Sequence, residues 1–141
     1  MNYWLIKSEP NEYSWDDLVK DGKSVWTGIR NYRARNNLKL MKEGDLAFFY
    51  HSNIGKEIVG VAKVVKEFYE DPTEKIDRSL CVGQWVAVDF APVKKLKRSV
   101  TLEEIKSNSK FKEMELVKIS RLSVSVVTKS EWEDVLKLSE T

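Results

Sequence analysis

Residues 46–68, with the sequence LAFFYHSNIGKEIVGVAKVVKEF, decide the class of fold. Residues 46–52 are apolar on both faces until the end of the run, which is typical of a buried strand. Residues 53–56 contain Asn and Gly, which favour turns. Residues 57–68 are again rich in β-branched side chains, as a second strand would be. The pattern therefore predicts an antiparallel hairpin.

Successive side chains of a strand point to opposite faces, so the hairpin can be assigned face by face. In the first strand we expect Tyr50 and His51 to point to opposite sides. In the second strand we expect Val59 and Val61 to share a face. Gly60 lies between them, and a glycine there indicates a bulge or the close approach of a backbone or a ligand.

Short helices and further strands flank this hairpin. We expect strands at 3–6, 84–93 and 121–127, and helices at 15–21, 31–41, 102–106 and after residue 130. The predicted N-caps are Ser14 with Asp17, Thr101 with Glu104, and Ser130. The strands are not spaced as βαβ units. The sequence therefore predicts an α+β fold, a small, partly open, mostly antiparallel β-barrel with flanking short helices, as one domain over residues 1–141.

Composition excludes several classes of protein. The 141 residues carry a net charge of +2, too small by itself to indicate nucleic-acid binding. A single cysteine, Cys81, and a single histidine, His51, rule out an internal disulfide and Cys- or His-rich metal sites. We expect no cofactor. No apolar run approaches the roughly 18 residues of a membrane span, and we see no signal peptide. The expected compartment is the cytoplasm.

Positive charge is concentrated in residues 26–36, WTGIRNYRARN. The segment contains three arginines, and no acidic residue occurs from residue 26 to residue 42. Guanidinium groups suit phosphates and carbonyl edges, and a tryptophan suits a planar ligand. A second basic run, residues 94–98, is interpreted first as a solvated edge and, if the chain binds nucleic acid, as a contact to phosphates.

These residue types can form a site for a planar base. Trp26 offers a stacking face, although a core tryptophan is an equally good interpretation. Small hydrogen-bonding groups come from Ser8, Asn31, Ser52 and Ser123, and cations come from Lys7, Arg30, Arg35 and Arg121. Such a mixture can read the edge of a base while the cations outside hold phosphates.

Catalysis has weaker support in the sequence. No phosphate-binding glycine loop, zinc spacing or nucleophile elbow is present. His51 at a strand end, or Glu9 with Lys7, are the candidate acid and base groups. For a lone histidine, however, a hydrogen-bonded structural role is the better interpretation. We therefore expect a protein that is not an enzyme.

Several motifs, in this order, resemble those of the EVE domain family of the PUA-like superfamily, over nearly the whole chain. The matching pieces are YWLIKSEP at 3–10, WTGIRNYRARN at 26–36, GD at 44–45, YHS at 50–52, Gly60, DPT at 71–73 and RLSV at 121–124. Two departures stand out. Arg33 replaces the usual glutamine, and Ser125-Val126 replaces the usual Gln-Pro.

The resemblance implies a PUA-like barrel with a pocket related to that of YTH domains, which hold a methylated adenine in an aromatic cage. It also implies binding of modified bases, with modified cytosine in DNA the leading candidate. Trp26 matches the YTH cage tryptophan, and residues 49–53 match a pocket-lining strand. The predicted ligand-binding residues are Ser8, Glu9, Trp26, Arg30, Asn31, Arg35, Tyr50, His51, Ser52, Arg121 and Ser123.

The expected partner is nucleic acid that carries a modified base, either DNA or RNA. We expect no membrane partner and a monomeric protein. Two alternatives stay open. One is an RNA-binding module of the PUA type that reads tRNA or rRNA, and the other is a small enzyme that processes nucleotides with His51 or Glu9.

Overall fold

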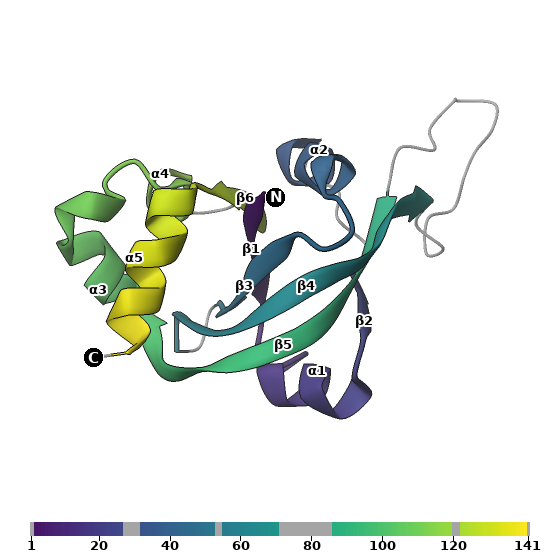
Figure 1. Ribbon diagram of the computed structural model, residues 1–141, viewed down its shortest axis with the longest axis horizontal. Helices are drawn as coiled ribbons and strands as arrows, with labels where there is room; N and C mark the ends of the chain where they lie inside the picture. Colours follow the sequence, from purple (N-terminus) through teal and green to yellow (C-terminus); the bar gives the residue numbers. More distant parts are fainter. Residues whose placement is uncertain (1, 27–31, 53–54, 71–85, 120–121, 141) are drawn as a thin grey trace.

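The computed structural model describes residues 2–26, 32–52, 55–70, 86–119 and 122–140. Within them, six strands form one sheet in the order β2-β5-β4-β3-β1-β6 (Figure 1). The strands are β1 (Tyr3–Ser8), β2 (Ser24–Trp26), β3 (Leu46–His51), β4 (Glu57–Glu70), β5 (Val86–Thr101) and β6 (Val124–Val127). All neighbours are antiparallel except β1 and β3, which are parallel. The expected mostly antiparallel, partly open barrel is confirmed.

Helices cover both faces of this curled sheet (Figure 1). They are α1 (Trp15–Asp21), α2 (Tyr32–Leu40), α3 (Leu102–Ser107), α4 (Glu115–Lys118) and α5 (Lys129–Ser139), with a 3-10 turn η1 (Ser109–Phe111). One core cluster lies against α1 and α2 and contains Trp15, Leu38 and Phe49. A second lies against α3, η1, α4 and α5 and contains Phe48, Phe111 and Trp132.

The predicted hairpin is confirmed, and its bulge lies at Gly60. The antiparallel register shifts there, because Phe49 is opposite Gly60 and Tyr50 is opposite Ile58. Val59 consequently packs in the first core cluster and Val61 in the second. The prediction that these two valines share a face is wrong, since the extra residue at the bulge reverses the alternation.

Local capping follows the sequence at two helices and departs from it at a third. Ser14 and Thr101 form the predicted capping boxes of α1 and α3. The last helix is capped by Thr128, whose hydroxyl accepts a hydrogen bond from the Glu131 N–H at 3.2 Å. The prediction of Ser130 is therefore wrong: the helix begins at Lys129, so Ser130 already lies inside its first turn.

Strand β5 is longer than expected. The sequence predicts an end at residue 93, but the strand continues to Thr101; it pairs with β4 as far as Lys95 and again at Val100 and Thr101. The basic run 94–98 is therefore part of a strand. Lys95 is opposite Gly60, on the side of the first core cluster, whereas Leu96 belongs to the second cluster. The run is thus divided between two faces of the sheet.

Helix α2 packs against β6, one of the two edge strands. The Asn37 side chain, 6% exposed, donates a hydrogen bond to the Val124 carbonyl at 2.7 Å. Arg33 forms an ion pair with Glu115, and the same carboxylate accepts a hydrogen bond from the Val126 N–H at 2.7 Å. The outer edge of β6 thus has backbone groups that already form hydrogen bonds with side chains. These groups are not available for pairing with another strand.

Candidate functional site

The parallel pairing of β1 and β3 gathers several predicted site residues at one edge of the sheet. Both strands end there, with Ser8 opposite His51. The Ser52 N–H donates to the Ser8 carbonyl at 2.9 Å, and the Lys7 N–H donates to the Ser123 carbonyl at 3.0 Å. The structure therefore brings Ser8, His51, Ser52 and Ser123 together although they are far apart in the sequence.

A tight turn after β1 continues this edge. The Ser8 hydroxyl donates to the Tyr13 carbonyl at 2.5 Å. The Glu9 carbonyl accepts from the N–H groups of Glu12 and Tyr13 at 2.9 and 2.8 Å. These bonds fix Tyr13 beside the strand end. Tyr13 is not among the predicted site residues, although an aromatic residue soon after Glu9-Pro10 is a signal for one.

Trp26 is part of the aromatic core next to this edge. Only 8% of the residue is exposed. Its ring meets those of Tyr13, Phe49 and Phe90 edge-on, with centroids 6.5, 5.8 and 5.6 Å away. The core interpretation of Trp26 thus holds. Its role as a stacking platform stays a prediction, and any base would meet it at the small part of its surface left open.

His51 has a structural hydrogen bond. Its Nε2 accepts from the Trp15 N–H at 3.0 Å, so the neutral ring carries its proton on Nδ1. Burial lowers the pKa of His51, while the nearby Glu57 and Asp16 raise it and Lys95 lowers it. The bond to Trp15 uses the lone pair that a general base would need at Nε2. The geometry therefore favours the structural role of this histidine.

Tyr50 lies on the opposite face of the sheet from His51. It is 3% exposed and packs in the second core cluster. Burial raises the pKa of Tyr50 to about 12 and lowers the pKa of Lys7, whose Nζ lies 5.7 Å from the Tyr50 ring centroid. The structure thus separates Tyr50 from the group formed by Ser8, His51 and Ser52.

The predicted cations are described only in part. Arg30, Asn31 and Arg121 lie outside the described residues, and so does the side chain of Arg35. Two other arginines, Arg33 and Arg98, form ion pairs within the protein. Arg33 pairs with Glu115, and Arg98 pairs with Glu104 at 2.8 Å and donates to the Leu138 carbonyl at 2.8 Å. Arg98, on β5, therefore connects this strand to α3 and α5.

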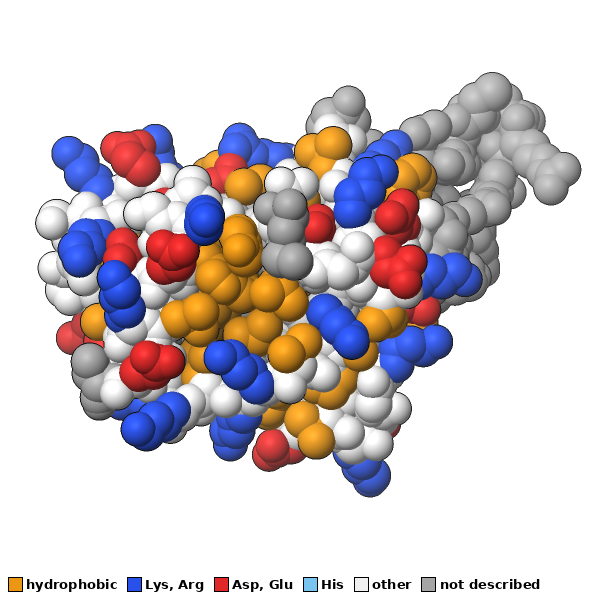
Figure 2. All heavy atoms as spheres, in the orientation of Figure 1, with side chains coloured by type: hydrophobic (Ala, Val, Ile, Leu, Met, Phe, Trp, Pro, Cys, Tyr) orange, Lys and Arg blue, Asp and Glu red, His pale blue; other side chains and the backbone are white. Residues whose placement is uncertain are grey.

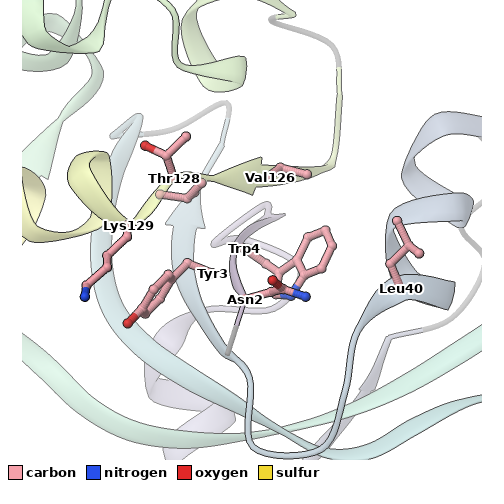
Figure 3. A pocket seen from close by; sticks show the side chains of 8 residues that line it. Asn2, Tyr3, Trp4, Leu40, Val126, Thr128 and Lys129 are labelled. Atoms are coloured by element: carbon pink, nitrogen blue, oxygen red, sulfur yellow. The ribbon is translucent and has the colours of Figure 1, made fainter.

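A mostly apolar hollow of about 610 Å³ lies on the face seen in Figure 2, where apolar side chains gather between α5 and α2. Trp4 and Val126 from neighbouring strands and Leu40 from α2 line one part of it, and Tyr3 and Lys129 another (Figure 3). Of the predicted ligand-binding residues whose side chains the structure describes, none lines this hollow.

A smaller hollow of about 250 Å³ adjoins His51 and is lined by charged residues of α1, β4 and β5. Across the described ranges, no three Cys, His, Asp or Glu side chains are grouped so that they could hold a metal ion. In the same part of the chain, no helix is long and apolar enough to cross a membrane.

Comparison with known proteins gives the family. The EVE domain matches residues 2–138. This chain belongs to the EVE domain family. Thymocyte nuclear protein 1 of Mus musculus is 38% identical over 172 aligned positions, which cover 99% of the chain and 74% of the mouse protein. The Homo sapiens protein is 36% identical over 171 positions, with the same coverages. These relatives are named as nuclear proteins, so the cytoplasmic compartment stays an expectation.

Several solved structures share the fold. The NMR structure of Rpa0253 from Rhodopseudomonas palustris has a TM-score of 0.90 and 45% identity, covering 99% of this chain and 94% of that one. Human THYN1, in complex with DNA containing 5-methylcytosine, has a TM-score of 0.90 and 35% identity, covering 100% and 99%. ASCH from Zymomonas mobilis has a TM-score of 0.62 and 15% identity, covering 97% of this chain and 95% of that one. It shares the fold alone. The PUA-like architecture is thereby confirmed.

Proposed function

We propose that this EVE domain binds a modified cytosine in DNA and does not catalyse a reaction. The observation that carries the proposal is the likeness to human THYN1, which was solved with 5-methylcytosine-containing DNA and aligns over the whole chain. The gathering of Ser8, Ser52 and Ser123 at one sheet edge supports it, together with Tyr13, which accepts a hydrogen bond from Ser8 and lies in ring contact with Trp26. The capped edge of β6 supports a monomer, because it leaves little backbone for pairing with a second copy.

In this proposal the base enters between the end of β1 and Trp26. Ser8, Asn31 and Ser52 form hydrogen bonds with the edge of the base, while Arg30 and Arg35 bind phosphates of the DNA backbone. Taking a base out of a duplex costs a few kcal/mol, and one stacking contact returns about 1–3 kcal/mol. Phosphate contacts supply the remainder, so binding should weaken as salt rises.

The test is equilibrium binding to matched oligonucleotides with cytosine or 5-methylcytosine at one position, as DNA and as RNA, at two salt concentrations. We expect a preference for the methylated DNA that falls in Trp26→Phe, a variant that keeps an aromatic ring in the core. Equal affinity for methylated and unmethylated DNA would overturn the proposal. Stronger binding to RNA would favour the RNA-binding alternative, since contacts to the 2′-hydroxyl select RNA.

Arg30 and Arg33 form a matched pair for the phosphate contacts. Arg30→Gln should weaken DNA binding and reduce the slope of log affinity against log salt by about 0.9 for one lost contact. Arg33→Gln should leave that slope unchanged, because Arg33 already pairs with Glu115. Equal effects of both variants would show that the arginines act only through net charge.

A further inference from the structure

The hollow beside His51 has features of an anion site that the proposed function does not use. It lies between the start of α1, the end of β3 and the strands β4 and β5. Lys95 and Lys97 line it from neighbouring positions on the same face of β5. Leu96, between them, also lines the hollow, although its side chain packs in the second core cluster. Two lysines of one strand therefore border the same hollow.

These lysines differ from the other basic side chains around them. Within the described part of the chain, neither Lys95 nor Lys97 has an acidic partner within 4.0 Å, whereas Arg98 pairs with Glu104 and Lys23 with Asp89. His51 adds a neutral ring whose Nδ1 carries a proton, because Nε2 accepts from the Trp15 N–H. The hollow therefore offers donors that no neighbouring carboxylate occupies.

Two carboxylates also line the hollow and limit what it can hold. Glu57 accepts a hydrogen bond from the Ser99 hydroxyl at 2.8 Å, and Asp16 lies in the first turn of α1. Their charge opposes a free anion. A phosphate that is tethered through the rest of a bound nucleic acid gains from a high effective concentration and does not have to bind alone.

The hollow and the proposed base site share one strand end. His51 is opposite Ser8 in the β1–β3 ladder, and the next residue, Ser52, donates its N–H to the Ser8 carbonyl. A nucleic acid with its base at Ser8 and Ser52 therefore passes close to His51. We propose that this hollow holds a backbone phosphate of the bound nucleic acid, with Lys95 and Lys97 as its cations. The inference rests on the proposed function.

The test compares charge removal on the two faces of β5. Lys95→Gln and Lys97→Gln should each weaken DNA binding, and the double variant should reduce the slope of log affinity against log salt by about 0.9 for the one phosphate. Lys94→Gln is the matched control, since Lys94 is opposite Val61 and so lies on the other face. Its slope should equal that of the wild-type protein. Equal slopes for all these variants would overturn the phosphate site.

A second substitution should act in the opposite direction. Asp16→Asn removes a negative charge from the hollow and should tighten DNA binding by about twofold, while Glu133→Gln, on α5, should not. Weaker or unchanged binding in Asp16→Asn would overturn the inference. The ratio of affinities for methylated and unmethylated DNA is read in the same titrations. Equal affinities of the wild-type protein for methylated and unmethylated DNA would contradict the proposed function. Equal salt slopes for the Lys95, Lys97 and Lys94 variants would contradict only the phosphate site.

Discussion

Gly60 and Trp15 are in direct contact, and the contact leaves no room for a side chain on the glycine. A Cβ at Gly60 would lie 2.6 Å from Cη2 and from Cζ3 of the indole. The ring of Trp15 is buried and packs edge-on against Phe49, with centroids 5.6 Å apart. The bulge in β4 and the position of α1 therefore depend on each other.

Gly60→Ala should destabilise the protein by about 1–3 kcal/mol, because the added methyl group overpacks the core against a ring that cannot move freely. Urea unfolding at equilibrium measures this free energy. In a Trp15→Leu background the same substitution should cost less, since leucine lacks the clashing ring atoms. A Gly60→Ala cost that is equal in both backgrounds would show that the strain has another origin.

The correct cap of α5 can be tested with two neighbouring substitutions. Thr128→Ala removes the hydroxyl that accepts from the Glu131 N–H, and it should cost about 1 kcal/mol of folding free energy. Ser130→Ala, on the exposed surface two residues later, should change stability by less than about 0.5 kcal/mol. Chemical denaturation of both variants decides between the two caps, and a larger loss for Ser130→Ala would contradict the structure.

Asn37 ties α2 to the edge of the sheet through a buried amide. Asn37→Asp keeps the shape of the side chain but places a carboxylate against the Val124 carbonyl, so we expect a loss of about 3 kcal/mol at neutral pH. Asn36→Asp, one residue earlier on the same helix, is the control and should cost much less. Because protonation restores a donor, the difference between the two variants should shrink in acid, and a difference independent of pH would argue against this contact.

His51 should give the stability of the protein a pH dependence near neutrality. Burial holds its pKa below the ordinary value of 6.5, so the unfolded chain binds more protons between the two pKa values. The stabilising contribution is therefore complete above about pH 6.5 and is lost as the pH falls through the folded pKa. Asp16, Glu57 and Lys95 surround the ring and set the size of the effect.

The chain has one histidine, so His51→Gln isolates this effect. Urea unfolding of both proteins at several pH values from 5 to 7.5 should show the wild-type stability falling more steeply toward acid than that of the variant. Parallel curves would mean that the hydrogen bond from the Trp15 N–H does not depend on the protonation state of the ring.

Local patterns predicted the parts of the fold that depend on a few neighbouring residues. The hairpin, the caps at Ser14 and Thr101, and the close approach at Gly60 all follow from spacing within one segment. The faces of β4 did not, because a bulge needs a partner strand before the reversal at Val59 is determined.

The candidate site was harder to predict because its members come from distant segments. The approach of Ser8 to Ser52 depends on a parallel pairing that no local pattern indicates. The predicted ligand-binding set includes both Tyr50 and His51 because they belong to one motif, although strand alternation places them on opposite faces. The basic run 94–98 is likewise predicted as one patch, although strand alternation separates Lys95 from Lys94.

The central place of β1 between β3 and β6 has a consequence for how the chain folds during synthesis. Trp4 is opposite Val126, so β1 receives one of its two neighbours from a segment that lies about 120 residues later in the chain. Synthesis proceeds at about 5–20 residues per second, so one edge of β1 stays unpaired for several seconds. Long-range pairing of this kind also slows folding. A nascent chain of this protein is therefore most exposed to aggregation before Val124 emerges, and a chaperone that covers β1 would act in that interval.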